Sequence, residues 1–209
     1  MSHQVIAIDG PAGSGKSSVA RALADALGWA FLDTGAMYRA ITCEVLARGL
    51  DVHDTFAVGE VARTVNLTTL PRVTVDGRDV TDELRSPNVN RAVSEVAANA
   101  AVRHALVARQ RQWAADQPEG TVVEGRDVTT VVFPDAPLKV FLTASLEERS
   151  RRRDDESHES VARRDWADST RLVSPLRQAT GAVVLDTTTR AIDEVVGEII
   201  RCLKTLNSN

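Results

Sequence analysis

The 209-residue sequence predicts an α/β fold built on a doubly wound, parallel sheet of five strands. Three observations support this prediction: short apolar runs of strand length, helical patterns between most of them, and a glycine-rich loop directly after the first run. The predicted strands are Val5–Asp9, Ala30–Asp33, Thr121–Glu124, Leu138–Thr143 and Val183–Asp186. The runs that end at Asp33, Glu124 and Asp186 place a carboxylate at a strand end, and ligands of open α/β sheets bind beyond the carboxyl ends of the strands.

The glycine-rich loop fits the G-x-x-x-x-G-K-[ST] pattern of a P-loop, which makes the predicted fold one of the P-loop NTPase type. Its glycines allow close approach of backbone N–H groups to an anion at the start of the next helix. Lys16 would reach the terminal phosphates of ATP, and the Ser17 hydroxyl would bind Mg²⁺. A turn that binds nothing is the alternative. The expected nucleotide-binding residues are Gly10, Pro11, Ala12, Gly13, Ser14, Gly15, Lys16, Ser17 and Ser18.

Composition excludes several classes of protein. The net charge is −4, from 25 basic and 29 acidic residues, which argues against general nucleic-acid binding. No apolar run approaches the ~20 residues of a membrane span, and no signal peptide is visible. Cys43 and Cys202 lie far apart in helical contexts, so we expect reduced structural thiols in a cytoplasmic protein.

The long connection between the second and third strands contains more than one crossover helix. A helix is expected over residues 36–48, and a single long helix over residues 89–116. Between them, Val65–Thr69 and Arg72–Val75 alternate like half-buried strands, and Asp76-Gly77 is a hairpin turn that leads into Arg78–Val80. The expected division is a core of residues 1–50, 88–145 and 172–209, a small β-containing insert of residues 51–87, and a mobile helical lid of residues 146–171.

The lid prediction depends on charge. The segment is dense in arginine and acidic residues and has few strongly apolar side chains after Leu146, namely Val161 and Trp166. A segment that buries little can move, as a lid must. A solvated pair of charged helices is the alternative.

Two strand ends carry candidate phosphate-binding groups. After the second strand, Thr34 could cap the next helix, and Arg39 follows within its first turns. After the third strand, Gly125 permits a tight exit that places Arg126 and Asp127 beside the ligand crevice. Each has a structural alternative: a capped helix with a surface arginine, and a simple salt bridge.

A third candidate lies in the lid segment. Arg164, Asp168 and Arg171 are spaced i, i+4, i+7 and share one helical face. They could hold a phosphate and a ribose hydroxyl, or form an ion-pair ladder. With the P-loop, the three candidates favour a nucleotide kinase over a P-loop switch protein, because the N-K-x-D motif of GTPases is absent.

With these motifs, the sequence resembles the bacterial cytidylate kinases, a family of nucleoside monophosphate kinases. The resemblance spans nearly the whole chain in the family's order, and the string that begins Gly125-Arg126-Asp127 is its most specific part. The matching segments are residues 8–17, 32–39, 94–98, 124–136, 168–171 and 174–176. Between Arg153 and Arg163 the chain is shorter than the family pattern.

The resemblance implies ATP- and Mg²⁺-dependent phosphorylation of CMP and dCMP by a monomer, in pyrimidine nucleotide metabolism. Asp127 would accept from the cytosine amino group and Arg103 would donate to N3 or O2, an arrangement that mispairs with uracil. The resemblance implies that the base is bound by Ser94, Arg103 and Asp127, and the CMP phosphate by Thr34, Arg39, Arg126 and Arg171. Arg164 and Asp168 would contact the sugar or complete the closed lid, and Arg149 and Arg153 would lie near ATP. The expected catalytic groups are Lys16, Arg126, Arg164 and Arg171.

Two other functions stay open on sequence grounds. A P-loop kinase of another branch would act on a sugar or a shikimate-like acid, and would need residues that recognise hydroxyl groups. A non-catalytic ATP-binding module would bind ATP tightly without turnover on any monophosphate. An assay with ATP-Mg²⁺ against several monophosphates separates all three functions.

Overall fold

The computed structural model describes residues 4–152, 158–171 and 173–206. The chain forms two compact units, one of residues 1–32 and 113–209 and one of residues 33–112. The second unit is larger than the expected insert of residues 51–87, since it also contains the helix that precedes the insert and most of the helical segment that follows it.

The first unit is built on the five-stranded sheet that the sequence predicts. The strand order is β2-β6-β1-β7-β8, and the pairs β1–β6, β1–β7 and β7–β8 are parallel. All five predicted strands are confirmed, with one additional residue at the end of the third. They are β1 (Val5–Asp9), β2 (Ala30–Asp33), β6 (Thr121–Gly125), β7 (Leu138–Thr143) and β8 (Val183–Asp186).

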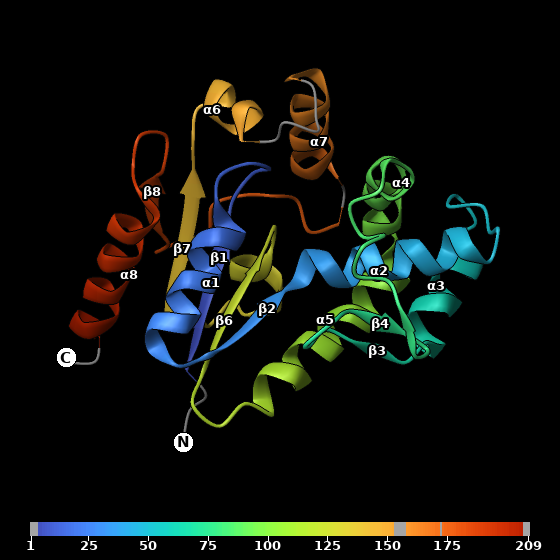
Figure 1. Ribbon diagram of the computed structural model, residues 1–209, viewed down its shortest axis with the longest axis horizontal. Coiled ribbons are helices and arrows are strands. Elements are labelled where there is room, and N and C mark those ends of the chain that lie inside the picture. The colour runs from blue at the N-terminus through green and yellow to red at the C-terminus, as the bar shows by residue number, and fades with distance from the viewer. Residues whose placement is uncertain (1–3, 153–157, 172, 207–209) are drawn as a thin grey trace. The chain divides into compact units, whose positions relative to one another are not determined.

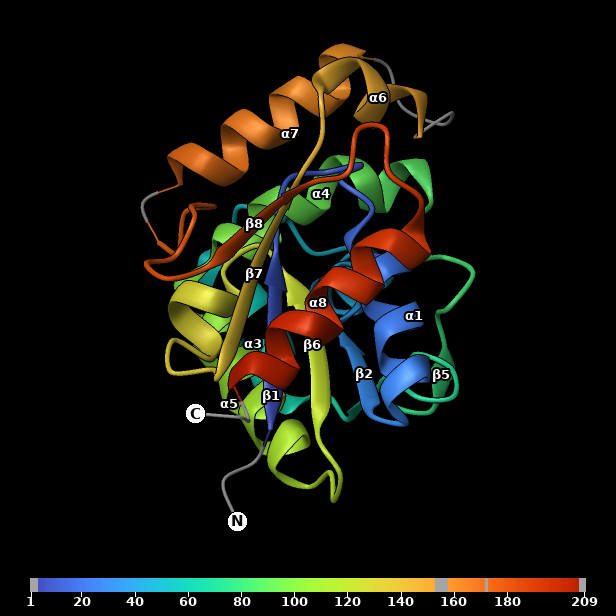
Figure 2. The same cartoon turned by 90° about the vertical axis from the view of Figure 1, so that its left-hand side faces the viewer.

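Two helices, α1 (Lys16–Leu27) and α8 (Ile192–Leu206), cover one face of this sheet (Figure 2). Their apolar residues recur at helical spacing, and α8 buries Val195, Val196, Ile199 and Leu203. These side chains share one core with Ile6 and Ile8 of β1 and with apolar residues of β6, β7 and β8. The packed core therefore fixes the position of the carboxyl end of β1, where the P-loop begins.

The segment expected to form the lid contains two helices, α6 (Leu146–Arg151) and α7 (His158–Thr170). In Figure 1 they lie beyond the carboxyl end of β7. Ser145 caps α6 by accepting a hydrogen bond from the backbone N–H of Glu148. A short π-helix, η1 (Val128–Val132), follows β6 and was not predicted.

The second unit contains helices and a small antiparallel sheet of order β3-β4-β5. This sheet confirms the β-containing insert, and Asp76 and Gly77 both have positive φ at its hairpin turn. The helix α3 lies in the same segment and was not predicted. The elements of this unit are α2 (Thr34–Ala47), α3 (Thr55–Thr64), β3 (Leu67–Thr68), β4 (Thr74–Val75), β5 (Arg78–Asp79), α4 (Pro87–Ala98) and α5 (Ala100–Ala115).

The expectation of one long helix over residues 89–116 is wrong, because the backbone of Asn99 is extended and separates α4 from α5. The Asn99 carboxamide oxygen accepts from the N–H groups of Ala101 at 2.9 Å and Val102 at 3.3 Å, so this residue caps the second helix. Its amide nitrogen donates to the carbonyl of Thr55 at 2.8 Å. The helical pattern of the sequence continues through Asn99. Its side chain nevertheless bonds to the backbone N–H groups of the next turn, which ends one helix and begins another.

No helix in the described ranges is both long and apolar enough to cross a membrane.

Candidate active site

The P-loop connects β1 to α1 in the first unit and packs closely against its surroundings. A Cβ at Gly10 would lie 2.1 Å from the carbonyl oxygen of Leu142. Gly13 has a φ of +74°, and a Cβ there would lie 2.5 Å from the carbonyl oxygen of Arg149. Only glycine fits either position, so these two glycines let the loop lie against β7 and α6.

Lys16 is buried at the start of α1, and its ammonium group donates to the carbonyl of Pro11 at 2.9 Å across the loop. Burial and, less strongly, the positive charge of Arg126 lower the pKa of Lys16 to about 8, against the opposing charges of Glu124, Asp9 and Asp168. These five charged groups therefore form one electrostatic cluster around the loop.

Ser17, the predicted Mg²⁺ ligand, donates from its hydroxyl to the carboxylate of Glu124 at 2.7 Å. Glu124 lies in β6, and its place at a strand end was the only sign of it in the sequence. A hydroxyl beside a carboxylate is a donor set of hard oxygens, which suits Mg²⁺. Within the described part of the chain, no group of three or more His, Cys, Asp or Glu side chains is arranged so that it could hold a metal ion. Mg²⁺ does not need one when water and phosphates complete its coordination.

Arg126, Asp168 and Arg171 lie together in the first unit. Asp168 of α7 pairs with Arg126 at 3.3 Å and with Arg171 at 3.6 Å, and all three side chains are largely buried. Arg126 also donates to the carbonyl of Gly10 at 3.1 Å, which attaches this cluster to the P-loop. Arg171 donates to the carbonyl of Ser174 at 2.9 Å. The cluster is more than a ladder within one helix, because Arg126 comes from the end of the sheet.

Arg149 and Arg153 were expected near ATP. Arg149 is buried and donates to the carbonyls of Ala12 and Ala144, each at 3.1 Å, and it pairs with Asp165 of α7. Asp165 in turn accepts from the Ala12 N–H at 3.2 Å. Arg149 thus joins the P-loop to both lid helices.

Two expected lid residues have no described side chain. Arg153 lies outside the described residues. Arg164 lies within α7, but its side chain is outside the described part of that helix. Both keep the roles expected from the sequence as proposals.

In the second unit, the expectation that Thr34 caps a helix is wrong. The helix α2 begins at Thr34, and the preceding Asp33 is its N-cap, accepting from the Ala36 N–H at 3.0 Å. A carboxylate at this position satisfies the terminal N–H more strongly than a hydroxyl at the next position could. Thr34 is buried in the first turn of the helix.

Arg39 of α2 is half-buried and donates to the Leu84 carbonyl at 2.7 Å and to the Asn90 side chain at 2.8 Å. These contacts hold its guanidinium between α2 and the start of α4. They are compatible with a further ligand, since a guanidinium has five N–H donors.

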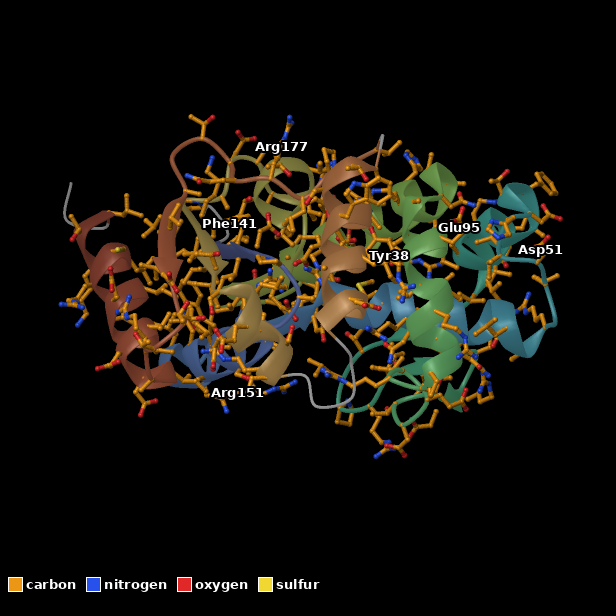
Figure 3. The ribbon with its side chains drawn as sticks, turned by 90° about the horizontal axis from the view of Figure 1, so that it is seen from above. Tyr38, Asp51, Glu95, Phe141, Arg151 and Arg177 are labelled. Carbon is orange, nitrogen blue, oxygen red and sulfur yellow. The ribbon has the colours of Figure 1, made fainter. Side chains whose placement is uncertain are left out.

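Two of the expected base-reading residues, Ser94 and Arg103, lie on different helices because of the break at Asn99. Ser94 is half-buried on α4. Arg103 is buried on α5, donates to the Ala97 carbonyl at 3.2 Å, and lies over the ring of Tyr38 with 5.4 Å between guanidinium carbon and ring centre. Figure 3 labels Tyr38 on α2. Tyr38 was not predicted, although it stands within a matching segment.

Asp127, the third expected base-reading residue, is buried in the first unit between β6 and η1. Its backbone carbonyl accepts from the N–H groups of Val131 and two neighbours in η1. Because Asp127 lies in the first unit while Ser94 and Arg103 lie in the second, a base site that uses all three is a proposal.

Two further residues that support the P-loop, Thr187 and Arg152, were not predicted from the sequence. Thr187, which follows β8, is buried and donates to the Ser14 carbonyl at 3.0 Å. Arg152, which follows α6, donates to the Thr187 hydroxyl at 2.9 Å and to its carbonyl at 2.6 Å. Arg152 lies within 3.5 Å of a Cβ built on Gly15. The only available signal was the position of Thr187 directly after a strand end.

The sequence is similar to known proteins over nearly its full length. The family model of cytidylate kinase matches residues 6–205. A cytidylate kinase of Mycobacterium leprae is 48% identical over 217 aligned positions, which cover 98% of this chain and 97% of that protein. A bifunctional pantoate ligase/cytidylate kinase of Trichormus variabilis is 45% identical, and the aligned region covers 94% of this chain. The chain spans only about two fifths of that bifunctional relative, since 40% of it is covered.

Among solved structures, a gluconokinase of Sinorhizobium meliloti superposes with a TM-score of 0.52 at 19% identity, covering 97% of this chain and 93% of that one. This likeness shows the shared α/β fold alone. The sequence matches show the family, because they extend over nearly the full chain at high identity. The chain belongs to the cytidylate kinase family.

Proposed function

We propose that this protein transfers the γ-phosphoryl group of ATP to the phosphate of CMP or dCMP, giving CDP or dCDP and ADP. Membership of the family supports the reaction. The observation that carries the mechanism is the arrangement in the first unit. There Lys16 and the Ser17–Glu124 pair lie in the same electrostatic cluster as Arg126, which is joined to Asp168.

Phosphoryl transfer needs alignment and positive charge more than covalent help from the protein. Lys16 would balance the β- and γ-phosphates, and Arg126 and Arg171 would hold the acceptor phosphate in line. Ser17 and Glu124 would hold Mg²⁺, which neutralises phosphate charge when bound. A general base is unnecessary, since the acceptor phosphate is already ionised. Arg164 would complete the site from the lid.

The acceptor would bind through the residues that the sequence indicates. Thr34 and Arg39 would meet the CMP phosphate, and Asp168 the sugar. Asp127 would accept from the cytosine amino group while Arg103 donates to N3 or O2, and Ser94 would complete the contacts to the base. Uracil carries an oxygen at C4 and an N–H group at N3. The Asp127 carboxylate would then face an oxygen, and Arg103 would face an N–H group.

The lid segment would close over ATP and exclude water, which suppresses wasteful hydrolysis. Cys43 and Cys202 are free thiols, which suits the reducing cytoplasm, where we place the protein in pyrimidine nucleotide metabolism as a monomer.

A coupled assay that measures ADP release with ATP-Mg²⁺ and CMP, dCMP, UMP or AMP tests the proposed function. We expect CMP and dCMP to be used with kcat/KM at least about 100-fold above UMP and AMP. A preference for UMP or AMP would contradict the substrate, and tight ATP binding without turnover of any monophosphate would contradict the reaction.

A further inference from the structure

The described side chains of the helix α7 form no apolar stripe. Among them only Asp168 is buried, and Trp166, the largest apolar one, is 69% exposed. A helix of a globular protein ordinarily packs through an apolar stripe, and α8 of the same unit does so. The described part of α7 is therefore attached to the first unit by other means.

Two carboxylates of α7 make its contacts with the rest of the first unit. Asp165 and Asp168 are spaced i, i+3, so they lie on one face of the helix. Asp165 accepts from the Ala12 N–H at 3.2 Å and pairs with Arg149. Asp168 pairs with Arg126 at 3.3 Å. The helix is thus held by charge at two points that are one turn apart.

Both points of attachment lead to the P-loop. Arg149 donates to the Ala12 carbonyl at 3.1 Å, so Asp165 and Arg149 together bond the N–H and the carbonyl of one buried loop residue. At the second point, Arg126 donates to the Gly10 carbonyl at 3.1 Å. Because Arg149 is itself buried, losing its carboxylate partner is costly.

We propose that Asp165 is a positioning residue: its carboxylate fixes α7 on the P-loop and thereby keeps Asp168, one turn further along, at Arg126. The last step rests on the proposed function, which assigns Arg126 to the acceptor phosphate. A helix held at one point can pivot, whereas two contacts one turn apart fix both its place and its rotation. Small displacements of a group that aligns a substrate cost much of the rate.

The first test is the initial rate of Asp165→Asn at saturating ATP-Mg²⁺ with CMP varied. Asparagine has nearly the same shape and can still accept from the Ala12 N–H, but it brings no negative charge to Arg149. We expect kcat/KM for CMP to fall at least about tenfold, as for loss of a hydrogen bond between charged groups. If Asp165 served ATP binding alone, saturating ATP would restore the wild-type value, and this result would overturn the inference.

The matched control is Glu159→Gln, which is also a change from acid to amide on α7, at an exposed side chain. It should keep kcat/KM for CMP within about threefold of wild type. An equal loss in both variants would show that the charge of the helix matters and not the contact of Asp165, and would overturn the inference.

Amide hydrogen exchange measures the attachment of α7 without any substrate. Exchange over residues 158–170 should be at least about tenfold faster in Asp165→Asn than in the wild type, while exchange over α8 stays the same. Equal exchange over α7 in the two proteins would overturn the inference, even if the variant were less active. An equal rise over α7 and α8 would show a general loss of stability and would overturn it too.

The outcomes separate this inference from the proposed function. A wild-type enzyme that does not phosphorylate CMP contradicts the proposed function, and the exchange experiment still tests whether Asp165 holds α7. If Asp165→Asn does not fold, exchange of the Ala12 N–H in the wild type replaces it. Slow exchange of this N–H supports the contact with Asp165, and exchange as fast as in an exposed loop overturns it.

Discussion

The Ser17 hydroxyl donates to the Glu124 carboxylate at 2.7 Å, which joins the first turn of α1 to the end of β6. Each residue comes from a rigid element of the same unit, and both lie beside Lys16. A P-loop hydroxyl and a carboxylate at a strand end are the two protein groups that hold Mg²⁺ in P-loop enzymes. The short contact makes Glu124 the partner that orients Ser17.

Glu124→Gln is expected to raise the Mg²⁺ concentration that gives half-maximal activity by about 10- to 100-fold, because the variant loses a negative oxygen donor. Titration of kinase activity with Mg²⁺ at saturating ATP and CMP measures this change. Ser17→Ala should act in the same direction.

The control for the Mg²⁺ titration is Glu119→Gln, an exposed residue just before β6, which should leave the titration unchanged. A Glu124→Gln enzyme whose Mg²⁺ requirement matches wild type would contradict the metal-binding role.

Arg126→Lys should lower kcat/KM for CMP by about 100-fold or more, since a lysine cannot reproduce the planar contacts to Asp168 and a phosphate together. Initial-rate kinetics with varied CMP measure this loss. Arg151→Lys is the matched control, because Arg151 is an exposed arginine on α6 (Figure 3). If both variants lost the same activity, Arg126 would have no special role at the acceptor phosphate.

The strands and the P-loop could be predicted from sequence because their signals are local. An apolar run such as Val5–Asp9 ends where a glycine loop begins, and the observed bounds are the same. The break at Asn99 could not be predicted, because it depends on a contact with Thr55, which is distant in sequence.

The same limit applies to the site. The charge of Arg149 suits an ATP-binding residue. Its partners, Asp165 and the backbone of Ala12, come from other elements and could not be predicted. Glu124 was visible as a strand-end carboxylate, yet only the fold brings it to Ser17. Sequence identifies which residue types are available, and tertiary packing decides which of them meet.

Asp165→Ala should lower the free energy of unfolding by about 1–3 kcal/mol, because buried Arg149 loses its carboxylate partner and the Ala12 N–H loses its acceptor. Urea unfolding followed by circular dichroism measures this change. Glu147→Ala, an exposed acidic residue on α6, should change stability by less than about 0.5 kcal/mol. A small effect at Asp165 would show that the P-loop is not held through α7.

The pH dependence of ATP use should follow Lys16, whose pKa burial lowers to about 8. A lowered lysine pKa means that the free enzyme loses the ammonium charge above about pH 8, so kcat/KM for ATP should fall there by about tenfold per pH unit. Phosphates of bound ATP favour the charged lysine, so kcat at saturating ATP should fall only at higher pH. A kcat/KM that stays flat from pH 7 to 10 would contradict this role.

The free energy of unfolding should depend on pH through the titration of Asp9. Its pKa is raised from 3.8 to about 6 in the folded state, so folding favours the protonated carboxyl. The stability from this group is therefore fully present below about pH 4 and is lost as pH rises through about 6, by an amount of up to about 3 kcal/mol. Asp9→Asn cannot titrate, so the wild type should lose stability relative to this variant between pH 4 and 6. Urea unfolding of both proteins from pH 4 to 8 measures the difference, and a constant difference across that range would show that Asp9 has no raised pKa.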